Sequence, residues 1–227
     1  MILRKWEELP KEMQNEQVRP YYDYLAKHKM SLAAKFLLDK VLAVVLLLIL
    51  SPIFLVIAIW IKCDSAGEVF FRQERVTRYG KKFRIYKFRT MVKNAESLGS
   101  QVTTNADMRV TEVGKKIRAC RLDEIPQLIN ILKGEMSFVG TRPEVPRYVE
   151  HYTEKMYATL LLPAGVTSEA SIEYKDEERL LSEADNADEV YITKVLPEKM
   201  QWNYKGLANQ GVFEDIKIML QTLGAVA

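Results

Sequence analysis

Cysteine and histidine are scarce in this chain, whose 227 residues include two of each. Cys63 and Cys120 lie far apart and outside any Cys-x-x-Cys pair, which fits a reducing compartment and no cysteine zinc site. His28 and His151 have no ligand spacing between them, so we interpret both as bystanders. The sequence therefore predicts no metal centre built from histidine or cysteine.

The sequence also lacks internal repeats, low-complexity tracts and the glycine patterns of common nucleotide sites. Gly-x-Gly-x-x-Gly and P-loop spacing are both absent, so any nucleotide must be bound by other means. Net charge is only +3, and basic residues are mixed with acidic ones rather than gathered in a patch. Nucleic acid is therefore not the expected partner. The length predicts one domain with short appendages.

One long apolar run is present, from Val41 to Ile61, with Ser51-Pro52 near its middle. At about 1.5 Å per residue it reaches roughly 30 Å, enough to cross a bilayer if straight. A secretory signal is not expected, because the run begins too far from the N-terminus and no small-residue cleavage site follows. Pro52 predicts a sharp kink, and the Ser51 hydroxyl can satisfy a carbonyl that the proline frees.

Basic residues flank both ends of this run, and basic flanks favour the cytoplasmic side. They are Lys27, Lys29, Lys35 and Lys40 before it, and Lys62, Arg72, Arg75, Arg78, Lys81 and Lys82 after it. We therefore favour a re-entrant helix over residues 35–62, which bends at Pro52 and returns to the same face. A single kinked span is the alternative, whereas a buried core helix without a polar face would be unusual in a domain of this size.

The remaining patterns predict an α+β fold, in which the membrane helix precedes a small, mainly helical domain (63–227) with one β-hairpin. The hairpin strands are Glu68–Val76 and Lys82–Met91, joined around Tyr79-Gly80-Lys81. The hairpin's basic residues suit either anionic lipid or phosphate. Residues 1–34 form a polar arm that either lies at the membrane interface as a helix or packs loosely.

Several shorter elements follow from local sequence. We expect a loop over Ser97–Arg109, a basic helix over Thr111–Arg118, a helical stretch near Val145–Met156, a turn at Pro163-Ala164-Gly165 and an acidic solvated surface over Glu173–Glu189. Near the C-terminus Phe213, Ile216, Leu220 and Leu223 recur at helical spacing and predict a docking face.

The most informative stretch runs from Leu122 to Pro143. Asp123 and Glu124 stand where a helix should begin, because Pro126 is tolerated only in a first turn and Gly134 is a natural stop. The positive end of a helix dipole favours ionised carboxylates. Such carboxylates can attack phosphorus or hold Mg²⁺, although an isolated acidic pair often only caps a helix.

Two arginines close to this pair favour the phosphate interpretation. Arg118 precedes the acidic residues and Arg142 follows them. Guanidinium forks match phosphate oxygens in geometry and charge. The stretch therefore predicts a site for phosphate chemistry next to a membrane helix.

Three segments of the chain resemble the bacterial sugar transferase family, the monotopic polyprenyl-phosphate phosphoglycosyl transferases. They are the Ser51-Pro52 break, the run Lys87-Phe88-Arg89-Thr90-Met91 and the long stretch Leu122 to Pro143. The resemblance implies an enzyme that moves a sugar-1-phosphate from a UDP-sugar to polyprenyl (undecaprenyl) phosphate. UMP is released, and an aspartyl-phosphosugar intermediate is formed. Such a reaction is the first membrane step of glycoconjugate assembly.

The same resemblance implies roles for individual residues. Asp123 would be the nucleophile, and Glu124 would help it to bind Mg²⁺. Arg118 and Arg142 would bind phosphate groups. From the basic character of the hairpin, we expect Lys87 and Arg89 to bind phosphate as well. The re-entrant helix would anchor a monotopic enzyme in the bacterial inner membrane with its catalytic domain in the cytoplasm, and a homodimer is left open.

The chain departs from the family pattern at two places, of which the second bears on the substrate. Thr141 replaces the usual proline before Arg142, and the segment Gly165–Tyr174 replaces the usual Gly-Ile/Leu-Thr-Gly pattern. We expect this segment to take part in choosing the sugar, although a plain surface loop is the alternative. A rival function is that of a membrane-attached, non-catalytic scaffold that grips anionic lipid.

Overall fold

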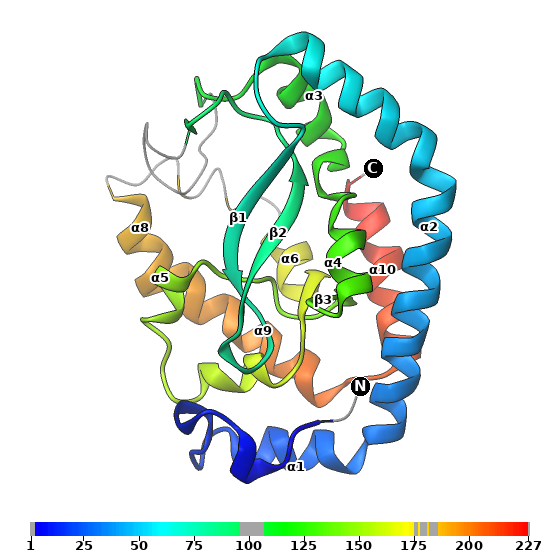
Figure 1. Ribbon diagram of the computed structural model, residues 1–227. Coiled ribbons are helices and arrows are strands. Elements are labelled where there is room, and N and C mark those ends of the chain that lie inside the picture. The colour runs from blue at the N-terminus through cyan, green and yellow to red at the C-terminus, as the bar shows by residue number, and fades with distance from the viewer. Residues whose placement is uncertain (1–2, 96–106, 175–176, 178–180, 182–185, 227) are drawn as a thin grey trace.

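The computed structural model describes residues 3–95, 107–174, 177, 181 and 186–226. The helices are α1 (Arg19–Lys27), α2 (Lys29–Asp64), α3 (Glu112–Ala119), α4 (Gln127–Lys133), α5 (Pro146–Val149), α6 (Glu169–Glu173), α8 (Ala187–Val190), α9 (Leu196–Ala208) and α10 (Val212–Val226). The strands are β1 (Phe70–Val76), β2 (Lys82–Phe88), β3 (Met136–Val139) and β4 (Ala164–Thr167). Figure 1 shows how these elements form a mixed α+β body with α2 along one side.

Helix α2 is a continuous arc whose two ends both turn toward the rest of the molecule (Figure 1). It begins before residue 35 and ends after residue 62, and Pro52 lies inside it without breaking it. The sharp kink that the sequence predicted at Pro52 is thus replaced by gradual curvature. The other half of that prediction is confirmed, since the Ser51 hydroxyl donates a hydrogen bond to the Leu48 carbonyl at 2.8 Å.

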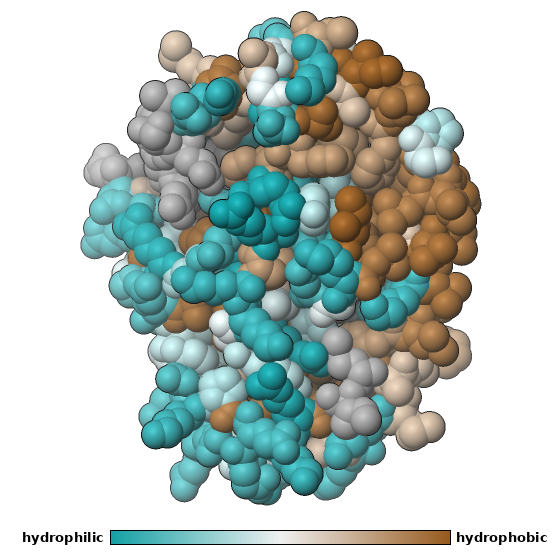
Figure 2. Space-filling model, in the orientation of Figure 1, coloured by the Kyte–Doolittle hydropathy of each residue, from teal (hydrophilic) through white to brown (hydrophobic). Residues whose placement is uncertain are grey.

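The outer face of α2 is a surface of exposed apolar side chains. Only 11% of the most apolar 18-residue stretch of α2 is buried. Among the described residues, α2 is the single helix that is long and apolar enough to cross a membrane. Figure 2 shows this hydrophobic surface along α2, whereas the face over the hairpin is mainly hydrophilic. Contact between this large apolar surface and water would be unfavourable, so the outer face of α2 is expected to contact a membrane or another protein.

The inner face of α2 packs against the body at two places. Ala43 is buried in a cluster with hairpin and α4 side chains, and Ile57 and Ile61 pack in another with Phe88 and Ile117. These contacts hold both halves of the helix against the body.

Lys35 of α2 is buried, although the sequence analysis counted it among the basic residues that flank the apolar run. Only 3% of its side chain is exposed, and its ammonium group lies 2.5 Å from Asp215 of α10. Lys35 is therefore not one of the basic residues flanking the apolar run on the surface. Instead, this buried ion pair ties the start of α2 to α10.

The predicted hairpin is confirmed, with β1 antiparallel to β2. The turn predicted at Pro163-Ala164-Gly165 is wrong, because Ala164 begins β4, which pairs with β3 in parallel. Two parallel strands are separated by a long connection in the sequence, so no local pattern predicts that β4 pairs with β3. Gly140 and Gly165 let the two backbones meet: a Cβ on Gly165 would lie 2.2 Å from the Gly140 amide nitrogen.

The N-terminal segment packs against the body, so the loose-arm alternative is wrong, whereas its position at the membrane interface stays a prediction. Leu9, Met13, Val18 and Leu25 are buried in one core with side chains from α9 and from the stretch 145–162. The helix predicted near Val145–Met156 is mostly wrong, since α5 covers only four residues, Pro146–Val149.

The C-terminal helix exists as predicted, and its apolar stripe is exposed rather than packed against the described part of the chain. Phe213 is 90% exposed and Leu223 is 69% exposed, while Asp215 and Ile218 form the inner face. The basic helix predicted over Thr111–Arg118 is confirmed as α3. Most of the loop predicted over Ser97–Arg109, and much of the acidic surface predicted over Glu173–Glu189, lie outside the described residues.

Candidate active site

The acidic pair lies in a tight turn rather than in the helix itself. Leu122–Glu124 form a single 3-10 turn, and α4 begins at Gln127, directly after Pro126. Gly134 ends α4 in the left-handed conformation (φ 75°), as predicted. The predicted helix start is therefore displaced by one turn. The 3-10 turn directs Asp123 and Glu124 toward β2, with which it is in contact.

Glu124 joins two cations that are distant in the sequence. One of its carboxylate oxygens, Oε1, accepts a hydrogen bond from the Lys87 ammonium group at 2.7 Å and another from the Arg142 guanidinium at 2.7 Å. Lys87 comes from β2 and Arg142 follows β3. The ammonium group of Lys87 also lies 4.0 Å from Asp123 Oδ2. Four predicted site residues thus form one cluster.

Burial and charge separate the two carboxyl groups. Burial raises the pKa of Asp123, and the charge of Lys87 offsets that rise only in part. Burial alone would also raise the pKa of Glu124, but Arg142 and Lys87 hold that pKa well below its usual value. Glu124 is thus the close ion-pair partner of two cations, whereas Asp123 lies 4.0 Å from the Lys87 ammonium group and is less closely paired.

The other two predicted phosphate-binding residues have different positions. Burial raises the pKa of Asp123, and the charge of Arg118 offsets part of that rise, so Arg118 acts on the cluster electrostatically. Arg89 donates instead to the backbone carbonyls of Ser65 and Ala66, at the end of α2. The structure therefore does not bring Arg89 into the cluster, because its guanidinium holds the turn that follows α2.

Arg75 is a site cation that sequence reasoning left among the general basic residues of the hairpin. Its guanidinium donates to Gln73 Oε1 at 2.6 Å and to the Pro143 carbonyl at 3.2 Å. Burial lowers the pKa of Arg75, and Glu144, Arg142 and Glu124 all act on it electrostatically. The alternation of side chains along a strand could have predicted this position. Phe71 pairs with Lys87, so Arg75, four residues after Phe71, falls on the same face of the hairpin as Lys87.

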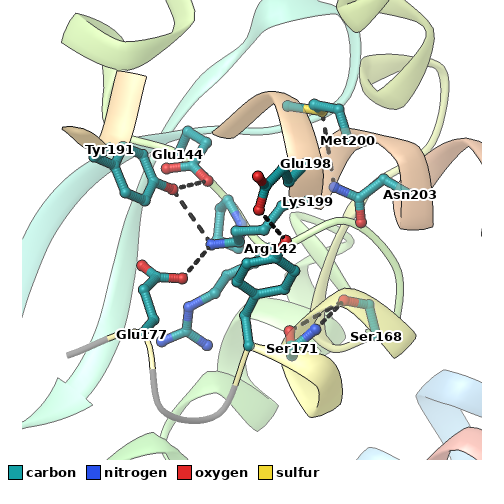
Figure 3. Close-up of polar contacts among 12 residues, drawn as sticks. Arg142, Glu144, Ser168, Ser171, Glu177, Tyr191, Glu198, Lys199, Met200 and Asn203 are labelled. Atoms are coloured by element: carbon teal, nitrogen blue, oxygen red, sulfur yellow. Dashed lines mark hydrogen bonds and ion pairs between the residues drawn. The ribbon is translucent and has the colours of Figure 1, made fainter. Parts of the chain in front are cut away.

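A second polar network, which no sequence motif predicted, lies next to Arg142 (Figure 3). The Tyr191 hydroxyl donates to Glu144 Oε1 at 2.6 Å, and Lys199 donates to Glu177 at 2.8 Å and to the Tyr191 hydroxyl at 3.3 Å. Tyr191 opens a π-helical turn, Tyr191–Val195, a form that often marks functional sites. Glu177 and Glu144 both act on Arg142 electrostatically and raise its pKa, after the larger effect of Glu124.

The sequence of the chain was compared with those of known protein families. The sequence model described as "Bacterial sugar transferase" matches residues 30–227. The chain belongs to the bacterial sugar transferase family. The match includes α2, the hairpin, the acidic pair and Arg142, so the clustered residues all lie within the family's shared region.

Several curated relatives in this family act on undecaprenyl phosphate by name. A UDP-N-acetylgalactosamine-undecaprenyl-phosphate N-acetylgalactosaminephosphotransferase of Aeromonas hydrophila is 35% identical over 193 residues, covering 83% of this chain and 42% of the relative. A UDP-glucose:undecaprenyl-phosphate glucose-1-phosphate transferase of Escherichia coli is 34% identical over 190 residues, covering 82% and 38%. The chain therefore spans less than half the length of these two relatives.

A shorter relative is covered more fully. A putative undecaprenyl-phosphate N-acetylgalactosaminyl 1-phosphate transferase of Bacillus subtilis is 41% identical over 125 residues, which is 55% of this chain and 70% of the relative. Two of these three names give N-acetylgalactosamine and one gives glucose, so the family match does not select one sugar.

The cluster contains two carboxylates, Asp123 and Glu124, which are ligands of the kind that a magnesium ion binds. Among the described residues, no group of three or more His, Cys, Asp or Glu side chains converges. Mg²⁺ does not need such a group, because it is usually bound by one or two carboxylates together with water and substrate phosphates. The hydrogen bonds from Lys87 and Arg142 both fall on Glu124 Oε1, so Glu124 Oε2 and the carboxylate of the preceding residue, Asp123, would be the oxygen ligands.

Proposed function

We propose that this chain transfers a sugar-1-phosphate from a UDP-sugar to polyprenyl phosphate, with undecaprenyl phosphate as the natural acceptor. The observation that carries the proposal is the convergence of Asp123 with Lys87, Arg142 and Glu124, beside a helix with an exposed apolar face. The relatives' names support the same reaction. A soluble phosphorylated donor and a lipid acceptor would meet at such a place.

In the first step, the Asp123 carboxylate attacks the phosphorus that carries the sugar. The bond from this phosphorus to the oxygen of the UMP group breaks, and UMP leaves with that electron pair. Arg142 keeps 36% of its side chain exposed and can turn part of its fork to the diphosphate while Glu124 holds the rest. Lys87, 4.0 Å from Asp123, favours the ionised form that attacks.

In the second step, a phosphate oxygen of the polyprenyl carrier attacks the same phosphorus and releases the Asp123 carboxylate. One nucleophile thus serves two substrates in turn, which avoids bringing both to the site together. Asp123 and Glu124 would hold Mg²⁺, which would offset the negative charge of the diphosphate and of the departing UMP.

We propose further that α2 lies in the cytoplasmic leaflet of the inner membrane and returns to the face from which it enters. Its arc, with both ends turned to the body, supports this re-entrant arrangement. Lys27 and Lys29 before the apolar run and Lys62 after it support a common cytoplasmic side for both ends. The exposed stripe of α10 adds a second apolar surface, tied to α2 through Lys35 and Asp215.

The direct test is release of UMP from a panel of UDP-sugars by purified protein with Mg²⁺ and undecaprenyl phosphate. The enzyme should release UMP with at least one donor and should form a lipid-linked diphosphate sugar. The rival scaffold function predicts no UMP from a folded protein with any donor. The contact of Lys87 with Glu124 speaks against the scaffold, because a purely lipid-gripping hairpin would direct this cation outward.

The covalent intermediate needs its own test. Incubation with a UDP-sugar in the absence of the lipid acceptor, followed by mass spectrometry of peptides, should find a sugar-phosphate adduct on Asp123. An Asp123→Asn variant is the matched control and should carry none. If the wild type releases UMP only when the acceptor is present and no adduct forms, the lipid phosphate attacks directly.

A further inference from the structure

A pocket adjoins the phosphate-binding side of the site, and the mechanism above does not use it. Its empty space, which includes open solvent at the mouth, is about 570 Å³. It lies between the ends of β3 and β4, the C-terminal half of α9 and the start of α10. Its polar lining includes Thr141, Ser168, Asn203, Gln210 and Glu214, and Trp202 adds an aromatic wall.

The pocket is built where two parallel strands end. Val139 ends β3 and Thr167 ends β4, and the close approach of Gly140 and Gly165 brings the residues that follow to one edge. Ligands of open parallel sheets bind outside the carboxyl ends of the strands. Thr141, Thr159 and Leu162 line both this pocket and a smaller one that Arg142 borders. A group joined to a phosphate at Arg142 therefore has this pocket within reach.

The polar groups of the pocket have unused hydrogen-bonding capacity. Asn203 is only 8% exposed, and its amide nitrogen donates to the sulfur of Met200 at 3.7 Å, a weak acceptor (Figure 3). The side-chain oxygen of Gln210 is buried and has no partner among the described residues. A buried acceptor without a donor costs stability, so such a group points to a ligand that supplies one.

The acidic lining of the pocket favours a neutral ligand over an anionic one. Glu169, Glu214 and Asp215 all border the pocket, and its described lining contains no lysine or arginine. A diphosphate is repelled there and favoured at Arg142 and Lys87 instead. The lining is rich in acceptors, which matches a hexose with its several hydroxyl donors. Uracil offers a single ring N–H and matches it poorly.

We propose that this pocket holds the sugar of the UDP-sugar donor, and that Asn203 and Gln210 discriminate between sugars by hydrogen bonds to its hydroxyl or acetamido groups. The proposal rests on the function proposed above. It also revises the expectation for the segment Gly165–Tyr174. Thr167 is already bonded to the Thr222 hydroxyl at 2.7 Å, whereas Ser168 borders the pocket and caps α6.

The test compares donor selectivity in two conservative variants, Gln210→Leu and Asn203→Asp. Rates of UMP release are measured for UDP-glucose, UDP-galactose and their N-acetylated counterparts. Inhibition by UMP is measured in parallel, because UMP lacks the sugar. We expect the ratio of kcat/KM between the preferred donor and the next to change at least about tenfold, with UMP inhibition within about twofold of wild type.

Gln201→Leu is the matched control, since it makes the same change on the exposed side of α9, next to the pocket-lining Trp202. It should leave the ratio unchanged. Thermal unfolding shows whether each variant is folded, and Gln210 on its connecting loop tolerates change better than buried Asn203. Unchanged ratios in a folded Gln210→Leu protein would overturn the proposal. A parallel loss of UMP inhibition would assign the pocket to the nucleoside. Absence of UMP release by the wild type would reject the proposed function instead.

Discussion

The Ser51 hydroxyl donates a hydrogen bond to the Leu48 carbonyl at 2.8 Å. This carbonyl lies four residues before Pro52, which has no N–H to offer it. The bond replaces the missing helix contact and lets α2 continue through the proline inside an apolar surface. An unsatisfied carbonyl at that place would be costly in lipid, where no water can replace the lost partner.

The first prediction concerns this replacement. Ser51→Ala should lower the free energy of unfolding by about 1 kcal/mol, the usual net value of one hydrogen bond. In a Pro52→Ala background the restored amide can bond to Leu48, so Ser51→Ala should then cost little. Thermal unfolding in nanodiscs, over the four proteins of this double-mutant cycle, provides the measurement. An equal cost in both backgrounds would show that Ser51 acts independently of the proline.

The second prediction separates activity from stability at Asp123. Asp123→Asn should abolish UMP release, because an amide does not attack phosphorus. It should also raise Tm near pH 7.5. Burial raises the pKa of Asp123, so its ionised form destabilises the folded protein above that pKa. The Tm gain, roughly 2–4 °C per kcal/mol, should shrink as the pH falls through the raised pKa.

Asp107 gives a control of opposite sign. The hydrogen bond from Arg109 lowers the pKa of Asp107, so its ionised form stabilises the fold above the ordinary pKa of an aspartate. Asp107→Asn should therefore lower Tm near neutral pH, and that deficit should also shrink in acid. A lower Tm for Asp123→Asn at neutral pH would contradict the assignment of Asp123 as a destabilised carboxylate.

The third prediction uses the pH profile of the reaction. Burial raises the pKa of Asp123, and Lys87, which lies 4.0 Å from Asp123, offsets part of that rise. Lys87→Met should move the acid limb of kcat/KM to higher pH and should reduce the plateau, by about 100-fold if Lys87 also contacts phosphate. Lys82→Met removes a cation from the same strand, where Lys82 pairs with Glu74 on the surface. An acid limb that moves equally in both variants would reflect general charge rather than this contact.

The fourth prediction concerns the path of α2. Single cysteines at Lys29 and Lys82, in a background without the exposed Cys63 and Cys120, report on the two ends. Both should resist an impermeant thiol reagent in intact cells and react after permeabilisation. Labelling of only one position in intact cells would establish a spanning helix. The catalytic assignment would survive that result, but the one-sided anchoring would not.

Local sequence determined the elements whose signals lie within a few residues. The alternating hairpin, the Thr111-capped α3 and the left-handed stop at Gly134 formed as predicted, because turn and capping preferences act over short distances. The bond from Ser51 was predictable for the same reason. The family resemblance named Lys87, Asp123, Glu124 and Arg142, and the fold brings these four together.

Tertiary structure alone decided which other charges join them. Arg75 and Arg89 are both hairpin arginines, yet one faces the site and the other holds the turn after α2. Lys35 is equally basic in sequence, and packing buries it against Asp215, 180 residues away. The strand β4 and the pocket at its end depend on pairing with distant β3. Such contacts join residues far apart in the chain, so the positions of the helices and strands select the partners, and no local pattern does.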